Sequence, residues 1–300
     1  MTIVYRPAQA QDLERTDALV VGSINDLTER HGFGAIASTH PPHFQMFSMK
    51  DDPGGLWVAE DNNDIVGFAW SWVCGDLWFL AQLFVSPHRQ GAGIGDELIR
   101  RTFAHAQAAG ATRRALITFS FNTVSQGLYI RHGLLPRCPI YTVSVARDHL
   151  MGRLQGDQLS CVPLEQTDAQ MQALAEIDIA ALGVSREKHH RFLMSDSATR
   201  GVTFRDRDAC LGYAYLSTSG HIGPLAVARP EILGAAFRAA LNLAVEGGSP
   251  QISAFLPGTA DTCLQIATEG GMRIKLPMLL MATRNVGDWV QYLPRNPGFM

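Results

Sequence analysis

The chain has 300 residues, more than one domain of ordinary size needs and enough for two of about 150 residues each. Hydrophobic residues make up 46% of it and charged residues 18%, with a formal net charge of -3 and no basic excess in either half, so each half can bury a core and nucleic acid is disfavoured as a partner. The first residues form no apolar secretory segment and no stretch reaches the ~18 apolar residues of a membrane span, which favours a cytoplasmic protein with no membrane partner.

Helices and strands are predicted from the spacing of apolar residues and from the turn residues between them. In chain order, the first half is predicted to hold a strand at 2–5, a helix at 10–30, a loop or broken helix at 31–42, strands at 56–60, 65–72 and 77–85, a helix from 96, a strand at 113–119, a helix at 122–132 and a strand at 141–145. An antiparallel meander followed by strand, helix and strand is typical of an α+β fold.

Five cysteines are scattered along the chain at positions 74, 138, 161, 210 and 263. Their number is odd and none forms the Cys-x-x-Cys pair that zinc sites and redox motifs use. We therefore expect reduced core cysteines, as in a cytosolic protein, and no metal site.

The stretch from Leu83 to Gly95 reads as a strand, a glycine loop and the start of a helix. Glycines at 91, 93 and 95 let the main chain approach an anion without a Cβ in the way, and the unpaired N–H groups of a first helical turn favour a phosphate. The spacing G-x-G-x-G is not the G-x-G-x-x-G of dinucleotide-binding folds, and no Gly-Lys-Ser/Thr of a triphosphatase loop follows. A nucleotide oxidoreductase is therefore disfavoured, and the loop is predicted to hold a pyrophosphate.

Two segments together resemble the GNAT acetyltransferase superfamily. The first is Gln90-x-x-Gly93-x-Gly95, which follows Leu83-x-Val85 and looks like the acetyl-coenzyme A loop of that family. The second is Asn122-x-x-Ser125-x-x-Leu128-Tyr129-x-x-x-Gly133-Leu134, in which Leu134 replaces the family's usual phenylalanine.

The resemblance implies an N-acetyltransferase with acetyl-coenzyme A as co-substrate and no metal, in which an amine attacks the thioester directly in a ternary complex. In this family the strand that carries Leu83 to Val85 splays from its neighbour, so that free N–H groups can pair with the pantetheine amide and the developing oxyanion. The residues that the resemblance assigns to cofactor binding are Leu83, Phe84, Val85, Gln90, Gly91, Ala92, Gly93, Ile94, Gly95, Asp96, Asn122 and Ser125.

The resemblance also implies Tyr129 as the proton donor to the departing thiolate, since a thiol has a reference pKa of about 8.5 and a tyrosine of about 10. The general base is not assigned, because Glu60, Asp76 and Gln82 lie on or near the right strands and none stands out. Two acids in the first turn of the helix, at 96 and 97, oppose a pyrophosphate unless they point away.

The second half looks like a copy of the first, after a linker at about 147–160. Residues 61–69 end in Val-Gly-Phe-Ala and residues 206–214 in Leu-Gly-Tyr-Ala, while Leu-Phe-Val at 83–85 is matched by Leu-Ala-Val at 225–227. The predicted fold is therefore α+β, of the three-layer α/β type, with two tandem GNAT-like domains, each a mixed, mostly antiparallel sheet flanked by helices. Residues 1–150 are predicted to form a catalytic domain and residues 161–300 a degenerate one.

The second copy lacks the groups that the chemistry needs. Pro230 removes a donor N–H and Glu231 adds negative charge where a pyrophosphate would sit. Aligning Gly133 with Gly271 places Ala267 opposite Tyr129. It also places Ala260 opposite Asn122.

The favoured function is acetyl transfer to the amine of a small molecule or a peptide. The alternative is a non-catalytic coenzyme A-binding sensor or interaction protein built on the duplicated fold. The duplication is compatible with a monomer that is internally a pseudo-dimer, or with a homodimer.

Overall fold

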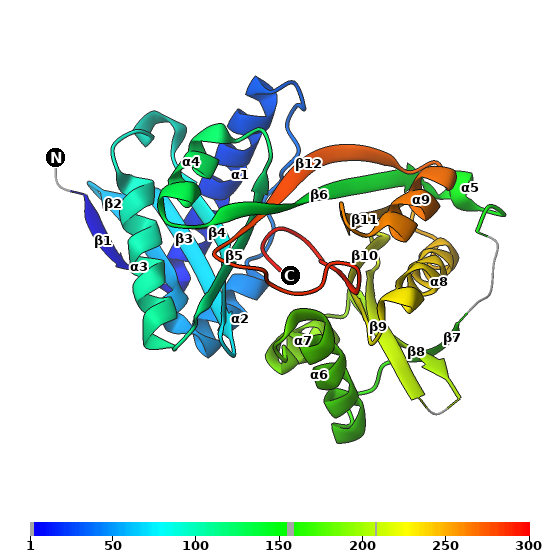
Figure 1. Cartoon of the computed structure of the whole chain (residues 1–300). Coiled ribbons are helices and arrows are strands. Elements are labelled where there is room, and N and C mark those ends of the chain that lie inside the picture. The colour runs from blue at the N-terminus through cyan, green and yellow to red at the C-terminus, as the bar shows by residue number, and fades with distance from the viewer. Residues whose placement is uncertain (1–2, 155–158, 208) are drawn as a thin grey trace. The chain divides into compact units, whose positions relative to one another are not determined.

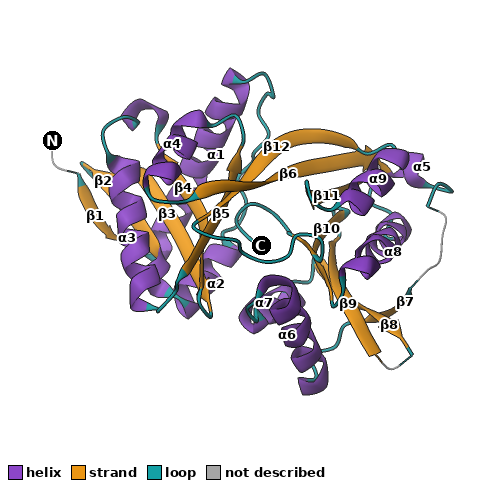
Figure 2. Ribbon diagram, in the orientation of Figure 1, coloured by secondary structure: helices purple, strands orange, loops and turns teal. Residues whose placement is uncertain are grey.

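The computed structural model describes residues 3–154, 159–207 and 209–300. Figure 1 colours the chain from its N- to its C-terminus, and Figure 2 colours it by secondary structure. One series of helices and strands occurs twice along the chain, and in each series a mixed sheet is flanked by helices. The predicted fold class is therefore confirmed.

The first series agrees closely with the prediction from apolar spacing. The strands predicted at 77–85 and 113–119 have the bounds observed, the helix predicted at 10–30 begins as a 3-10 turn, and the last strand is longer than predicted. The elements are β1 (Val4–Pro7), η1 (Ala10–Asp12), α1 (Leu13–Arg30), α2 (His43–Asp51), η2 (Pro53–Gly55), β2 (Leu56–Asp61), β3 (Asp64–Cys74), β4 (Leu77–Val85), η3 (Pro87–Arg89), α3 (Ile94–Ala108), β5 (Arg113–Phe119), α4 (Thr123–Arg131), β6 (Leu135–Ala146) and α5 (Arg147–Leu150).

Among the described residues, the second series repeats this order without counterparts of η1, η2 and α5, and adds one short strand at its end. Its elements are β7 (Ser160–Pro163), α6 (Asp168–Leu182), α7 (Glu187–Ser195), β8 (Thr199–Asp206), β9 (Ala209–Ser217), β10 (His221–Val227), η4 (Pro230–Ile232), α8 (Leu233–Glu246), β11 (Gln251–Pro257), α9 (Asp261–Glu269), β12 (Arg273–Ala282) and β13 (Tyr292–Leu293). Strands β4 and β10 end at the two positions that the sequence comparison had paired, Val85 and Val227. Helices α4 and α9 have equal length and follow the paired residues Asn122 and Ala260.

Contacts divide the chain into two compact units, and each unit includes residues from the other series. The first unit runs to Ile117 and adds Phe121–Leu135 and Met281–Arg284, while the second holds Pro136–Leu280 and the C-terminal residues. Strand β6 of the first series thus pairs with β11 in the second unit. The end of β12 lies beside β5 in the first unit, where Thr283 N donates to Arg114 O at 3.0 Å.

The domain boundaries predicted from sequence remain a prediction. The segment expected to be the linker, 147–160, begins with the short helix α5. Its residues 155–158 lie outside the described part of the chain.

In the first unit, the sheet order is β1-β2-β3-β4-β5, with antiparallel neighbours except for the parallel pair β4–β5. Ala69 on β3 packs against Ile94 and Leu98 of α3. The next residue, Trp70, points to the opposite face, where its ring lies edge-on to Phe44 of α2 at 4.9 Å. Helix α3 and helix α2 therefore cover opposite faces of this sheet (Figure 1).

In the second unit, the sheet order is β7-β8-β9-β10-β11-β6-β12. Its apolar core joins Ala214 of β9 to helices α8 and α9, with Phe237 fully buried at the centre. Tyr213 and Tyr215 flank Ala214 on β9. Because side chains alternate along a strand, both tyrosines lie on the other face of the sheet, toward α6 and α7.

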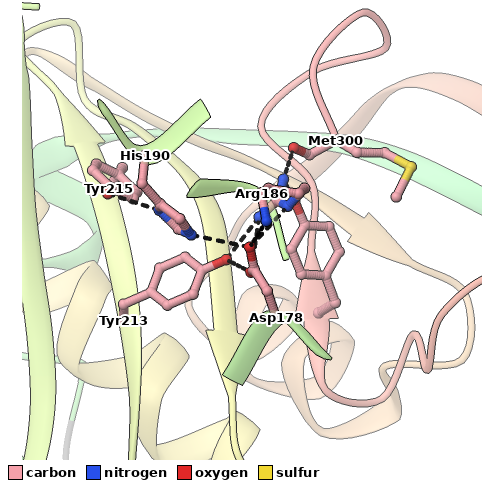
Figure 3. A network of polar contacts seen from close by, with 7 residues as sticks. Asp178, Arg186, His190, Tyr213, Tyr215 and Met300 are labelled. Atoms are coloured by element: carbon pink, nitrogen blue, oxygen red, sulfur yellow. Dashed lines mark hydrogen bonds and ion pairs between the residues drawn. The ribbon is translucent and has the colours of Figure 1, made fainter. Parts of the chain in front are cut away.

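A buried polar network fills that other face (Figure 3). Asp178 of α6 pairs with Arg186 at 3.2 Å and with His190 of α7 at 3.0 Å, and it accepts from the Tyr213 hydroxyl. His190 Nδ1 lies 2.9 Å from the Tyr215 hydroxyl. Burial alone would raise the pKa of Asp178, but the Arg186 charge and then His190 hold that pKa well below its ordinary value. The ion pair is tolerated in the interior because its charges are matched and hydrogen-bonded.

The second unit is expected to lose stability as the pH falls from about 6.5 toward 4. Burial lowers the pKa of His221 to about 4 and also lowers that of His189, so the unfolded chain takes up protons in this range that the folded chain does not. The contribution of each histidine to stability is therefore full above about pH 6.5 and falls with the pH.

Urea unfolding followed at pH 7.5, 6 and 5 measures this decline. The variant His221→Gln keeps a polar side chain opposite Ser253, which His221 contacts at 2.9 Å, but does not titrate. It should decline less steeply than the wild type, and an equally steep decline would contradict the assignment to His221.

Candidate functional site

Strands β4 and β5 separate part-way along their length. Their parallel pairing runs from Leu77 with Arg113 to Leu80 with Leu116 and stops there. On its other side, β4 stays paired with β3 to its end, through a one-residue bulge at Ala81. Residues 81–85 thus have a partner strand on one side only, which is the splay that the family resemblance implied.

The main-chain groups of Leu83 and Val85 point into the resulting gap. Ser86 N donates to Val66 O at 2.9 Å, which makes Val85 and its partner on β3 a non-hydrogen-bonded pair of the antiparallel ladder. The N–H and C=O of Val85, and of Leu83 two residues earlier, therefore face away from β3 and toward β5. Gln90 Nε2 donates to Val85 O at 3.2 Å and so ties the following loop to the strand.

The loop between β4 and α3 requires glycine at two positions because of its backbone conformation. Steric crowding is not the reason. Gly91 and Gly93 have φ of 82° and 80°, in the left-handed region that other residues rarely adopt. A Cβ at either position would meet nothing within 4 Å, so this face of the loop is open.

The backbone amides of residues 91–96 are unoccupied. The first helical hydrogen bond in this region joins Glu97 N to Gly93 O at 3.1 Å. Within residues 3–154, 159–207 and 209–300, no acceptor pairs with the amides of 91–96, and Gly93 provides no side-chain cap. Unpaired amides at the start of a 15-residue helix form an anion-binding surface.

The two acids in the first turn of α3 are neutralised by basic neighbours. Asp96 Oδ2 accepts from Arg100 at 2.6 Å, and Asp96 Oδ1 lies 2.9 Å from His132 Nε2. Arg100 also contacts Glu97, which pairs with Arg101 at 2.9 Å. Arg100 and then His132 lower the pKa of Asp96, so this carboxylate is charged and compensated. The repulsion expected between these two acids and a bound pyrophosphate is thereby reduced.

Removing that compensation is expected to weaken anion binding. In Arg100→Ala, the carboxylates of Asp96 and Glu97 would lose a shared cation beside the loop, and we expect the Kd for coenzyme A to rise by roughly 2- to 5-fold at low salt. Calorimetric titration at two ionic strengths measures the effect, which should shrink at high salt because the pairs are exposed. Arg30→Ala removes a comparable exposed pair with Asp26 on α1 and serves as the control. An equal rise in both variants would contradict a local electrostatic origin.

Asn122 and Ser125 build the start of α4. The Asn122 side chain caps the helix by accepting from Ser125 N at 3.2 Å. Phe121, just before it, stacks on Phe33 with ring centroids 4.8 Å apart. This cap is a sufficient structural role for Asn122, whereas the family resemblance assigns Asn122 to cofactor binding.

Tyr129 is buried near the end of α4, with 5% of its surface exposed. Burial raises the pKa of its hydroxyl, and a hydrogen bond with Ser125 acts in the opposite direction. The phenol is therefore fully protonated at neutral pH, as a proton donor must be. The raised pKa also makes transfer to a solvated thiolate less favourable than reference pKa values suggest.

The acids considered as general bases are engaged elsewhere. Glu60 accepts from Arg6 at 2.8 Å, and Asp76 accepts from Arg113 at 2.9 Å. Arg113 lowers the pKa of Asp76, which makes it a weaker base. Gln82 lies opposite Trp70 on β3, and its buried Oε1 finds no partner among the described residues.

One ion pair beside the loop was not predicted. Arg89 contacts Asp61, whose side chain is 2% exposed, so this arginine anchors the loop to the end of β2. The sequence offered no signal for it, because the two residues are 28 positions apart and meet only through the sheet.

Comparison with known protein families decides the identity of this region. Residues 23–134 match the family model described as Acetyltransferase (GNAT) family. The chain contains a GNAT domain. The match includes the splayed end of β4, the glycine loop and Tyr129, so all predicted site residues of the GNAT domain lie inside it.

Solved structures extend the likeness to the whole chain. A putative acetyltransferase from Pyrococcus horikoshii is 17% identical and superposes with a TM-score of 0.78, covering 99% of this chain and 96% of that one. A GCN5-related N-acetyltransferase from Sphaerobacter thermophilus is 14% identical, with a TM-score of 0.63 over 96% of this chain and 98% of that one. A tandem GNAT protein from the clavulanic acid biosynthesis pathway is 14% identical, with a TM-score of 0.61 over 94% and 98%. At these identities the likeness shows a shared fold, here the tandem GNAT fold. No curated protein matches the sequence.

The part of the chain that the structure describes holds neither a metal-binding cluster nor a membrane-spanning helix. No cluster of three or more histidine, cysteine, aspartate or glutamate side chains there is arranged to hold a metal ion. No helix in the same residues is both long and apolar enough to cross a membrane.

Proposed function

We propose that the GNAT domain binds acetyl-coenzyme A along the free edge of β4 and transfers the acetyl group to an amine. The observation that carries this proposal is the end of β4–β5 pairing at Leu80 and Leu116, with the main-chain groups of Leu83 and Val85 left facing the gap. A pantetheine arm carries amide groups that can hydrogen-bond to such an edge, as an added strand would. The function follows from main-chain geometry, so the side chains of 83–85 need only be apolar.

The glycine loop supplies the second half of the binding site. The amides of residues 91–96 and the positive end of the α3 dipole would hold the diphosphate, with Gly91 and Gly93 allowing close approach. Pairing of Asp96 with Arg100 and His132 supports this role, because it reduces the repulsion that the carboxylate would otherwise exert.

Tyr129 is proposed to give its proton to the leaving sulfur. As the amine nitrogen bonds to the acyl carbon and the carbon–sulfur bond breaks, the thiolate needs one proton and the attacking nitrogen must lose one. N–H groups on the edge of β4 that faces the gap would stabilise the oxygen that becomes negative. Holding both reactants in one site contributes much of the acceleration.

Gln82 is proposed to orient the attacking amine. An alkylamine of pKa about 10.4 is only about 0.1% neutral at pH 7, a cost of roughly 4 kcal/mol that a base or water chain must offset. Glu60 and Asp76 are held by Arg6 and Arg113, whereas Gln82 Oε1 has no partner in the described residues and can accept from an N–H. We therefore place proton removal on water beside Gln82 and not on a carboxylate.

The two copies are proposed to have different roles, as the sequence suggested. Residues 1–150 form the catalytic domain, and residues 161–300 form a non-catalytic copy. The second copy has alanine at the positions equivalent to Tyr129 and Asn122. The first unit nevertheless includes Met281–Arg284, so a fragment ending before that segment would lose a strand beside β5. All experiments below therefore use the full chain.

The test combines binding with turnover. Acetyl-coenzyme A should bind the full chain in a calorimetric titration, and thiol release should be stimulated by at least one member of a panel of small amines, amino acids, aminoglycosides and lysine peptides. Binding with no release for any acceptor would favour the sensor alternative. Absence of binding would refute the proposal.

A further inference from the structure

The C-terminal segment, residues 285–300, lies on the edge of β10 that corresponds to the free edge of β4. Strand β13 within it pairs antiparallel with β10, with Leu293 opposite Leu225 and Tyr292 opposite Ala226. The pairing between β10 and β11 is correspondingly short, covering His221 and Ile222 only. The second unit therefore has the same splay as the first, with a strand of its own placed in it.

The main-chain groups with which the C-terminal segment pairs are the counterparts of those that face the gap in β4. Ala228 N donates to Leu211 O at 2.8 Å, the equivalent of the bond from Ser86 to Val66, so Val227 faces away from β9 as Val85 faces away from β3. Val227 N donates to Gln291 O at 3.0 Å, and Gln291 Nε2 donates back to Val227 O at 3.1 Å. One glutamine thus satisfies both groups.

We propose that the C-terminal segment is an internal ligand that permanently fills the cofactor slot of the second copy, so that each chain takes up one acyl-coenzyme A, in the first unit. The location of that one molecule rests on the proposed function. The filling of the second slot is argued from the contacts of β13 and does not depend on the proposed function. Its physical reason is that a splayed strand without a cofactor would leave buried N–H and C=O groups unpaired, and β13 pairs them.

The buried network of the second unit holds this segment in place (Figure 3). Arg186 Nη1 donates to the Tyr292 hydroxyl at 2.7 Å and to the main-chain oxygen of Met300. His221 Nε2 contacts the main-chain oxygen of Arg295 at 2.5 Å. Tyr292, Phe299 and Met300 are at most 2% exposed. Figure 3 shows Arg186 between Asp178 and Met300, so the charge pair fixes the guanidinium that clamps the segment.

The loop after β10 supports the same conclusion independently of the segment. Where the first unit has Gly93 with positive φ before α3, the second has Ile232 in a right-handed conformation before α8, as the last residue of the turn η4 that starts at Pro230. Glu231 lies in that turn. Among the described residues its carboxylate pairs only with the exposed Arg229, at 3.4 Å. A diphosphate would find fewer free amides and an added negative charge there.

Hydrogen exchange of the full chain, with and without saturating acetyl-coenzyme A, tests the inference. In the free protein, the amides of Val227 and of 291–293 should exchange slowly. Those of Leu83, Val85 and 91–96 should exchange quickly, whereas the amide of Phe84, which lies on the side of β4 that pairs with β3, should not. Acetyl-coenzyme A should slow exchange at 83–96 and change nothing at 225–232 or 285–300. Slowed exchange at 225–232, or faster exchange at 285–300, on adding acetyl-coenzyme A would overturn the proposal.

Two matched variants separate the clamp from general destabilisation of the buried network. Tyr292→Phe removes the hydroxyl that Arg186 binds, and exchange at Val227 and 291–293 should accelerate at least tenfold. Tyr215→Phe removes the hydroxyl that His190 contacts without touching the segment, and should leave those rates within about twofold. Equal acceleration in both variants would overturn the clamp.

The two proposals fail in different ways. If acetyl-coenzyme A changes the exchange rate of no amide in the chain, the proposed function fails. The exchange rates of the free wild-type protein and of Tyr292→Phe still test whether the C-terminal segment fills the second slot. Fast exchange at Val227 in the free wild-type protein would overturn the filled slot, whatever the first unit binds.

Discussion

Replacing Tyr129 by phenylalanine is expected to lower kcat by roughly 10- to 1000-fold while the Kd for acetyl-coenzyme A changes less than about threefold. The hydroxyl is the group proposed to protonate the leaving sulfur, and it is buried, so no other solvent proton reaches that position as readily. Steady-state thiol release with a competent amine gives kcat, and calorimetric titration gives Kd. A kcat equal to that of the wild type would refute the role of Tyr129.

Two further variants make this test specific. Tyr5→Phe changes a half-buried tyrosine on β1 of the same unit, whose ring lies 5.1 Å from the Arg101 guanidinium, and should leave kcat unchanged. Ser125→Ala removes a hydrogen bond that lowers the pKa of Tyr129, so that pKa should rise further and kcat should fall by a smaller factor than in Tyr129→Phe. Because an acid catalyst loses activity as the pH rises through its pKa, the wild type should retain its Tyr129-dependent activity up to about pH 10.

Replacing Gly93 by valine is expected to raise the Kd for acetyl-coenzyme A by roughly 10- to 1000-fold, the loss of one or two charge-assisted hydrogen bonds. The residue has φ of 80°, which a β-branched side chain strongly disfavours, so the loop must move and its amides with it. Calorimetric titration of the full chain measures the change in Kd.

Gly110→Val is the matched control for that variant. Gly110 follows the other end of α3 with φ of 72°, and a Cβ there would also meet nothing within 4 Å. Both variants therefore impose a similar backbone strain, and their losses of thermal stability should be similar. Only Gly93→Val should weaken binding, and equal Kd values in the two variants would argue against an anion site at the loop.

Local patterns were enough to predict most helices and strands of the first series. Strands β4 and β5 have the predicted bounds because each is an apolar run bounded by turn residues, and burial on the sheet follows from that composition. The duplication was also visible in short matches, and the paired positions at the ends of β4 and β10 prove equivalent in hydrogen bonding. The glycines at 91 and 93 were recognisable because only their conformational freedom suits the loop.

Contacts between distant residues were beyond such patterns. The compensation of Asp96 by His132 joins α3 to the end of α4, and the anchoring of Arg89 by Asp61 joins the loop to β2. The Asp178–Arg186–His190 network was not anticipated at all, although a histidine pair and an arginine at the start of a helix were legible in the sequence at 186–190. Nothing local shows that these charges are buried together.

By itself, the sequence determined the two-copy α+β organisation, the strand–glycine loop–helix of the first copy and the degeneracy of the second, because each depends on residue types at short spacing. Tertiary structure alone decided where β4 parts from β5, which segments each unit takes from the other half of the sequence, and that β13 pairs with β10. Those features depend on pairing between main-chain groups far apart in the chain, and every residue carries the same N–H and C=O, so side-chain pattern does not encode them.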